Sequence, residues 1–252
     1  MRKIKKTWQL LALSTVISFS PLVDPIITSA FAQNSTYSVS SDPFLPSSQI
    51  TSIASETLAS STNRAKLRIL HSRLLAYFSG FPTVNSNLSV PIAANNGLSR
   101  IGDCSDRLNV VISAVNEINR ISGSTIDGVV RIVHFDRSEP NVFHAFIDFN
   151  LGRGFVHFDP SSHSFGRLSV LGNYRIIRSL SFSEYRYLFH KEWGDYFLMR
   201  NDCSHAIEAY NRALVFYSND PNLHQNLSVA YGNCGRPALA TSHLNIANSI
   251  RP

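Results

Sequence analysis

Three residue types that thiol-based acyl transfer requires follow one another along this chain: Cys104, His144 and Asp159. A thiol becomes a strong nucleophile when a neighbouring base holds it as the thiolate, and that base works best when an acceptor fixes its orientation. We expect the Cys104 thiolate to attack an amide carbonyl and His144 to protonate the leaving amine, while Asp159 fixes the imidazole tautomer.

Cys104 lies where a helix is expected to begin, and a helix start has unpaired backbone N–H groups and a positive dipole end that favour a thiolate. Its neighbours Asp103 and Asp106 oppose a thiolate, so the site requires a cation. The backbone N–H of Cys104 is a candidate donor to the oxyanion. Asn95 and Asn96 are candidates for a second donor.

His144 and Asp159 lie on an expected β-hairpin with strands over 142–150 and 154–158. A two-residue loop would place His144 directly opposite Asp159, and a four-residue loop would still leave both on one face, because side chains alternate with a period of two. The opposite face is apolar and should be the core, and it consists of Phe143, Ala145, Ile147, Phe149, Val156 and Phe158. We therefore expect the face of His144 and Asp159 to meet the helix of Cys104.

The elements that must position these residues follow from apolar periodicity. An apolar stripe of helical period predicts a helix from about Arg64 to 78, and a second helix runs from Cys104 until Gly123 ends it. A period of two then predicts a strand over 129–135, followed by the hairpin. Helices followed by an antiparallel meander predict an α+β domain.

The last third of the chain resembles itself at one fixed offset, at which Phe197 matches Tyr231 and Ala206 matches Ala240. Tyr210 likewise matches Leu244, and Ala213 matches Ala247. This offset is the period of the tetratricopeptide repeat, about 34 residues, and the segment 187–252 resembles that repeat. Since two repeats do not form a self-sufficient solenoid, they must pack on the preceding domain, on a second copy or on a partner.

Residues 1–32 resemble a secretory signal, with a basic start, an apolar run and Ala30-Phe31-Ala32 before the expected cleavage. Residues 33–62 are rich in Ser and Thr and are interpreted as a linker that could partly order on the domain. We expect a periplasmic or secreted protein with no membrane span after cleavage.

The formal charge of +6 does not indicate a nucleic-acid partner, because four of the cations lie in the first six residues. Removing residues 1–32 leaves 19 Lys and Arg against 16 Asp and Glu. His134, His157 and His163 lack the short spacing of metal ligands, so we expect no metal and no cofactor. Cys203 and Cys234 could form a disulfide or remain two buried thiols.

The motifs around these residues resemble the transglutaminase-like cysteine hydrolase superfamily, over roughly residues 64–170. They are Gly-x-Cys-x-Asp at Cys104, His-Ala-Phe at His144, and Gly-Phe-Val-x-Phe-Asp-Pro at Asp159. The resemblance implies a papain-like Cys-His-Asp triad on these three residues. Phe146 replaces the usual tryptophan, and no calcium cluster is evident.

The resulting organisation is a signal peptide over 1–32, the linker over 33–62, a transglutaminase-like catalytic domain over 63–182 and an all-α tetratricopeptide pair over 187–252. The expected function is that of an exported thiol protease or amidase, either hydrolase or acyl transferase, acting on a protein or peptide. The repeats would recruit a protein partner.

Two alternatives remain open at this point. The chain also resembles the NlpC-type murein endopeptidases, in which His157 would replace Asp159 as the orienting residue. Alternatively, it is a non-catalytic interaction protein that keeps the same scaffold and binds through its repeats.

Overall fold

The computed structural model describes residues 37, 42–78, 104–135, 143–152, 154–161, 165–166 and 174–251. The expected signal peptide, Asn95, Asn96 and His163 lie outside this described part. No helix within it has the length and apolar content needed to cross a membrane.

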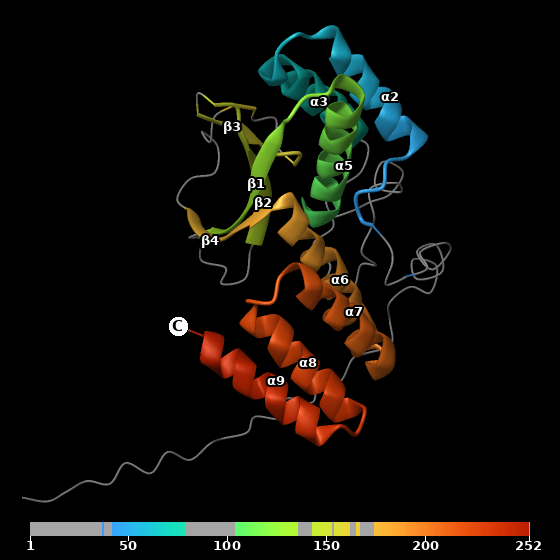
Figure 1. Ribbon diagram of the computed structural model, residues 1–252, viewed down its shortest axis with the longest axis vertical. Helices are drawn as coiled ribbons and strands as arrows, with labels where there is room; N and C mark the ends of the chain where they lie inside the picture. Colours follow the sequence, from blue (N-terminus) through green and yellow to red (C-terminus); the bar gives the residue numbers. More distant parts are fainter. Residues whose placement is uncertain are drawn as a thin grey trace, which may run out of the picture. The chain divides into compact units, whose positions relative to one another are not determined.

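Four antiparallel strands form one sheet in the order β3-β2-β1-β4 (Figure 1). They are β1 (Asp127–Phe135), β2 (Phe143–Asn150), β3 (Phe155–Phe158) and β4 (Tyr174–Ser181). The first three follow the predicted period of two. The sequence analysis missed β4, because this edge strand has adjacent apolar residues at Ile176 and Ile177, both exposed, in place of a clean alternation.

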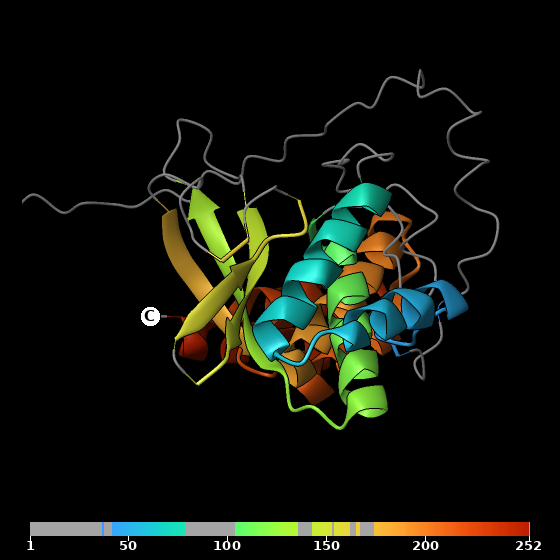
Figure 2. The ribbon, with the colours of Figure 1, turned by 90° about the horizontal axis from the view of Figure 1, so that it is seen from above.

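Among the described residues, seven α-helices and one short 3-10 helix accompany the sheet, so the expected mixture of helix and sheet is confirmed. The helices are α2 (Ser48–Glu56), α3 (Asn63–Phe78), α5 (Cys104–Ser122), α6 (Phe182–Met199), α7 (Cys203–Phe216), α8 (Pro221–Asn233) and α9 (Pro237–Ile250). Figure 2 shows α3 and α5 on one side of the sheet. Their bounds agree closely with the two helices predicted from apolar periodicity.

Helix α5 is the central helix of the core. It shares its buried side chains with the apolar face of β2 and β3, including Ile147, Phe149 and Phe158. At its C-terminal end, the Asn119 side chain makes two hydrogen bonds of 2.8 Å with the backbone of Ile126, which closes the turn into β1. Because this turn is short, β1 runs back alongside α5 in the opposite direction (Figure 1).

Part of the expected linker is ordered on this core. Helix α2 lies within residues 33–62 and buries Ile50, Ile53 and Ala54. Thr51 also donates a 3.1 Å hydrogen bond to Glu117 of α5. The sequence analysis did not predict this short helix, because only three of its apolar residues face the core. One of the serines counted as linker, Ser47, is its N-cap and accepts a hydrogen bond from the Ile50 N–H.

The helical region repeats with the predicted period. Helix α6 ends at Met199, and the same offset leads to Asn233, where α8 ends. The bounds of α7, Cys203 and Phe216, likewise correspond to those of α9, Pro237 and Ile250. Gly194 allows α6 and α7 to approach closely, because a Cβ atom there would overlap the Tyr210 ring.

The helical region and the sheet belong to the same compact unit, which extends from Ser35 to the end of the chain. The predicted domain boundary at 182–187 falls inside α6. Arg178 of β4 forms a salt bridge of 2.6 Å with Asp220, the N-cap of α8. Of the three packing arrangements considered for the repeats, the structure therefore has the one on the preceding domain.

Candidate active site

His144 and Asp159 form a direct pair: Nε2 of the imidazole lies 2.9 Å from Oδ2 of the carboxylate. The hairpin register explains how they meet. Asn150 pairs with Phe155 across a four-residue loop, and Ile147 pairs with Phe158. In this register Asp159 follows the end of β3 diagonally across from His144, the second residue of β2, and both side chains lie on one face.

Asp159 is buried and held by two further hydrogen bonds. It is 1% exposed, and its second carboxylate oxygen accepts a 2.8 Å hydrogen bond from the Ser161 N–H. Its backbone carbonyl accepts from Nε2 of His71 at 3.1 Å. Because both carboxylate oxygens act as acceptors, the Nε2–H of His144 donates the hydrogen bond to Asp159. Nδ1 is then the ring nitrogen that carries the lone pair.

Sequence reasoning missed His71, a residue of α3 that is 4% exposed. Its ring packs edge-on against Phe158, with centroids 4.9 Å apart, just before Asp159. The available signal was its position: His71 follows Leu70 and precedes Leu74 on the buried stripe of α3, where a polar residue requires a specific partner.

Cys104 is the first residue of α5, half-buried and reduced. From Ser122 back to Cys104, the helix spans about 27 Å at about 1.5 Å per residue. From Asp127 to Val133, the residue that pairs with His144, β1 spans about 20 Å. The helix and the strand run in opposite directions from one short turn (Figure 1). The two spans therefore place Cys104 and His144 toward the same end of the sheet.

One expectation about this arrangement is wrong. We expected the face of His144 and Asp159 to meet the helix of Cys104, but α5 packs on the opposite, apolar face that includes Ala145 and Ile147. Large buried side chains on α5 require an apolar partner surface, and the polar face of the strands does not provide one. Cys104, His144 and Asp159 thus share an end of the sheet, not a face.

The start of α5 is fixed by contacts with α6. The Ser105 hydroxyl donates to Glu192 at 3.0 Å, and the Tyr185 hydroxyl donates to the Ser105 carbonyl at 3.3 Å. Arg107 lies over the Phe78 ring of α3, with its guanidinium carbon 5.1 Å from the ring centroid. Residues from both α3 and α6 therefore hold the first turn of the helix that bears the thiol, and none of these partners was predicted from the sequence.

His157, the residue required by the murein endopeptidase alternative, has a different partner. Its Nδ1 lies 3.4 Å from Asp148, and its ring packs against Phe146, with centroids 4.3 Å apart. It pairs in register with Asp148, which is four residues from His144 along β2, or about 13 Å. The geometry favours Asp159 over His157 as the residue that orients His144.

Asp148 also pairs with Arg131 at 3.0 Å. Burial would raise the pKa of Asp148, but hydrogen bonds from His157 and Arg131 outweigh it and hold that pKa below its usual value.

No cluster of three or more His, Cys, Asp or Glu placed to hold a metal ion occurs among the described residues.

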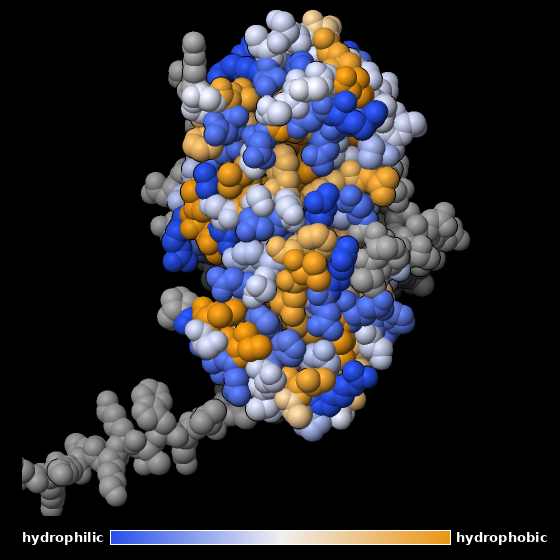
Figure 3. All heavy atoms as spheres, in the orientation of Figure 1, coloured by the Kyte–Doolittle hydropathy of each residue, from blue (hydrophilic) through white to orange (hydrophobic). Residues whose placement is uncertain are grey.

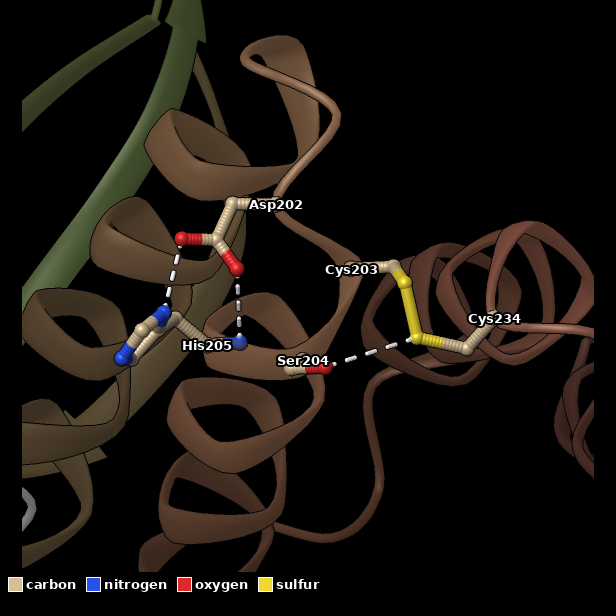
Figure 4. Close-up of a disulfide and its surroundings, with 5 residues drawn as sticks. All are labelled: Asp202, Cys203, Ser204, His205 and Cys234. Carbon is tan, nitrogen blue, oxygen red and sulfur yellow. Dashed lines mark hydrogen bonds and ion pairs between the residues drawn. A yellow bond between two sulfur atoms is a disulfide. The ribbon is translucent and has the colours of Figure 1, made fainter.

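Cys203 and Cys234, whose state the sequence left open, form a disulfide that joins the start of α7 to the end of α8 (Figure 4). Beside it, Asp202 caps α7 by accepting from the His205 N–H at 3.2 Å.

No known protein family, curated protein or solved structure was found to match this chain.

Proposed function

We propose that this chain is an exported cysteine-dependent enzyme that cleaves or transfers acyl groups at amide bonds, with Cys104 as nucleophile, His144 as base and Asp159 as orienting acceptor. The observation that carries the proposal is the 2.9 Å pair between His144 and the buried Asp159. A surface histidine has no need of such a firmly held partner. A catalytic base does, because the acceptor sets which ring nitrogen takes up the proton.

In the proposed reaction, the Cys104 sulfur forms a thioester with the acyl carbon while the C–N bond breaks. The imidazolium of His144 gives its proton to the leaving amine. Water, or an amine in a transfer reaction, then attacks the thioester and passes its proton back to His144, and the thiol is released. Backbone N–H groups at the start of α5 are suited to stabilise the oxyanion in both steps.

The proposed fold is a papain-like, transglutaminase-like domain followed by a tetratricopeptide pair. The catalytic domain is supported by the order of its elements, in which a helix and a strand precede the hairpin of His144 and Asp159. The tetratricopeptide pair is supported by helix bounds that recur at the period of that repeat. We further propose that the repeats bind a protein partner, since apolar side chains such as Val215, Val229 and Leu239 are exposed on them. Figure 3 shows apolar patches at the surface of this region.

We propose a periplasmic or secreted location. The signal-like sequence over 1–32 supports it, and so does the Cys203–Cys234 disulfide, because disulfides persist mainly in oxidising compartments.

The test is the reactivity of Cys104 toward iodoacetamide at about pH 6, followed by mass spectrometry without reductant. Cys104 is the one cysteine outside the disulfide, so the same residue in urea-unfolded chain is its own reference. We expect the folded chain to react at least tenfold faster than the unfolded chain, because an ordinary thiol with a pKa of about 8.5 is almost fully protonated under these conditions. His144→Ala should remove this difference.

Equal reactivity in the folded chain, the unfolded chain and His144→Ala would reject the enzyme and leave the non-catalytic interaction protein. A reactive Cys104 is then tested on a peptide mixture and on purified peptidoglycan, with Cys104→Ala as the control. New peptide termini that depend on Cys104 support the proposal, whereas release of muropeptides alone would support the murein alternative.

A further inference from the structure

Tyr37, a few residues beyond the expected signal cleavage, packs against an aromatic cluster of α6 and α7. We call the place that its ring occupies in this cluster the Tyr37 pocket. Its hydroxyl is 3.1 Å from Nδ1 of His190, and its ring lies against Trp193 and Phe197, with centroids 5.3 and 5.7 Å away. Ala209 of α7 is fully buried in the same cluster. Burial raises the pKa of the Tyr37 phenol, so it remains a neutral hydrogen-bonding group.

Contact with α6 is also made by Asp42 and Phe44, further along the chain. Asp42 pairs with Arg186 at 3.3 Å, and the guanidinium of Arg186 lies over the buried Phe44 ring, 4.7 Å from its centroid. The chain then enters α2 and packs on α5. Tyr37 is therefore the outer anchor of a segment that joins the helical repeats to the helix of Cys104.

The pocket has more hydrogen-bonding capacity than Tyr37 uses. His190 is fully buried and Trp193 is 4% exposed, yet Nε2 of the first and Nε1 of the second have no hydrogen-bond partner among the described residues. Nε of Arg212, whose guanidinium lies over Phe216 beside His190, is in the same situation. Buried donors without partners cost free energy, and the carbonyl groups of a bound peptide would satisfy them.

Burial lowers the pKa of His190 to about 4, so its imidazole is neutral at physiological pH. A neutral ring has one donor and one acceptor nitrogen, which suits a phenol on one side and a peptide group on the other. An aromatic floor with a hydrogen-bonding group beyond the ring edge selects tyrosine over phenylalanine.

We propose that this pocket, formed by His190, Trp193, Phe197, Ala209 and Arg212, is a binding site for a tyrosine-bearing extended peptide, and that Tyr37 of the same chain occupies it. The site fastens the N-terminal segment of the exported chain to the repeats. The assignment does not depend on the chemistry of Cys104.

The test uses the chain from Gln33 onward, in which Trp193 is the sole tryptophan, so its fluorescence reports directly on the pocket. The probe is a synthetic peptide of residues 33–46. We expect Tyr37→Ala, which vacates the pocket, to bind this peptide with a saturable change in fluorescence. A peptide with alanine in place of Tyr37 should bind about tenfold more weakly or worse, because one buried aromatic ring is lost.

The parent chain is the matched control, since its pocket is already filled, and it should show no binding at the same concentrations. Failure of a folded Tyr37→Ala chain to bind the peptide would overturn the proposal, as would equal binding by the parent chain. If Tyr37→Ala lowers the folded fraction, Tyr37→Phe gives the second measurement. A phenylalanine ring lacks the hydroxyl that contacts His190. The peptide should therefore displace Phe at position 37 at a lower peptide concentration than it needs to displace Tyr37.

Discussion

Arg178 and Asp220 form a two-point ion pair between the edge strand β4 and the start of α8. Nη2 donates to Oδ1 at 2.6 Å and Nη1 to Oδ2 at 2.7 Å. Asp220 is 1% exposed and also accepts from the Asn222 N–H at the start of α8. The Arg178 guanidinium lies over the Tyr187 ring as well, 5.8 Å from its centroid. One side chain of β4 thus contacts both pairs of helices: it reaches α6 through Tyr187 and the start of α8 through Asp220.

Arg178→Met should lower the free energy of unfolding by about 3 kcal/mol, because it leaves the Asp220 carboxylate buried without its cation. Urea denaturation at neutral pH measures the change. Arg175→Met is the matched control: it makes the same substitution three residues earlier on β4, at an exposed position, and should change stability by less than about 0.5 kcal/mol. Equal effects of the two variants would show that the pair contributes nothing specific.

The same pair predicts a pH dependence. Burial would raise the pKa of Asp220, but the hydrogen bonds and charge of Arg178 outweigh it and hold that pKa below its usual 3.8. A folded-state pKa below the unfolded value adds stability above about pH 4, and this stability is lost as the pH falls through the folded-state pKa. The difference in unfolding free energy between parent and Arg178→Met should therefore shrink from about pH 7 to about pH 3. A constant difference over this range would contradict the assignment.

Periodicity was sufficient to predict the elements that bury one regular face. Helices α3 and α5, strands β1 to β3 and the helical repeat all follow from the spacing of apolar residues. It failed for β4, an edge strand with exposed isoleucines, and for α2, which has only three buried residues. Both elements depend on contacts with distant segments, which local spacing does not encode.

The candidate site was predictable to a similar extent. The alternation of side chains in the hairpin predicts that His144 and Asp159 share a face, and they do. Neither the hydrogen bond from His71 to Asp159 nor the contact of Ser105 with Glu192 could be inferred, because the partners are 88 and 87 residues apart. The choice of face for α5 was wrong because it was argued from the chemistry of His144, whereas apolar burial decides how a helix docks.

Asp159→Ala should lower Cys104-dependent amide hydrolysis about 10³- to 10⁴-fold, because it removes the acceptor that fixes the imidazole tautomer of His144. Initial rates on the cleaved peptide measure this, with circular dichroism as the check on folding. His157→Gln is the control, since His157 pairs with Asp148, and it should retain most of the rate. The reverse order of effects would favour the murein endopeptidase alternative, in which His157 orients His144.

Reduction of the Cys203–Cys234 disulfide should lower the free energy of unfolding by about 3 kcal/mol, because the cross-link joins positions 31 apart in the sequence and restricts the unfolded chain. Urea denaturation with and without a phosphine reductant measures the change. The Cys104→Ser variant should lose the same unfolding free energy on reduction, because Cys104 lies outside the disulfide. Thiol titration of the chain unfolded without reductant should count one thiol out of the three cysteines. Three thiols in protein prepared without reductant would contradict the bridge.

Two glycines in the helical region should respond to alanine with opposite signs. At Gly194 a Cβ atom would overlap the ring of Tyr210, which is fully buried and donates a 2.7 Å hydrogen bond to Asp195. The ring has no room to withdraw, so Gly194→Ala should destabilise the protein by about 1–3 kcal/mol.

Gly232, near the end of α8, is helical, and a Cβ atom added to it would meet no other atom within 4 Å. Gly232→Ala should therefore stabilise the protein by about 0.5 kcal/mol through the lower conformational entropy of the unfolded chain. Thermal unfolding of both variants measures the two effects side by side. Destabilisation by both would point to a general intolerance of alanine in these helices, and it would contradict a close contact specific to α6 and α7.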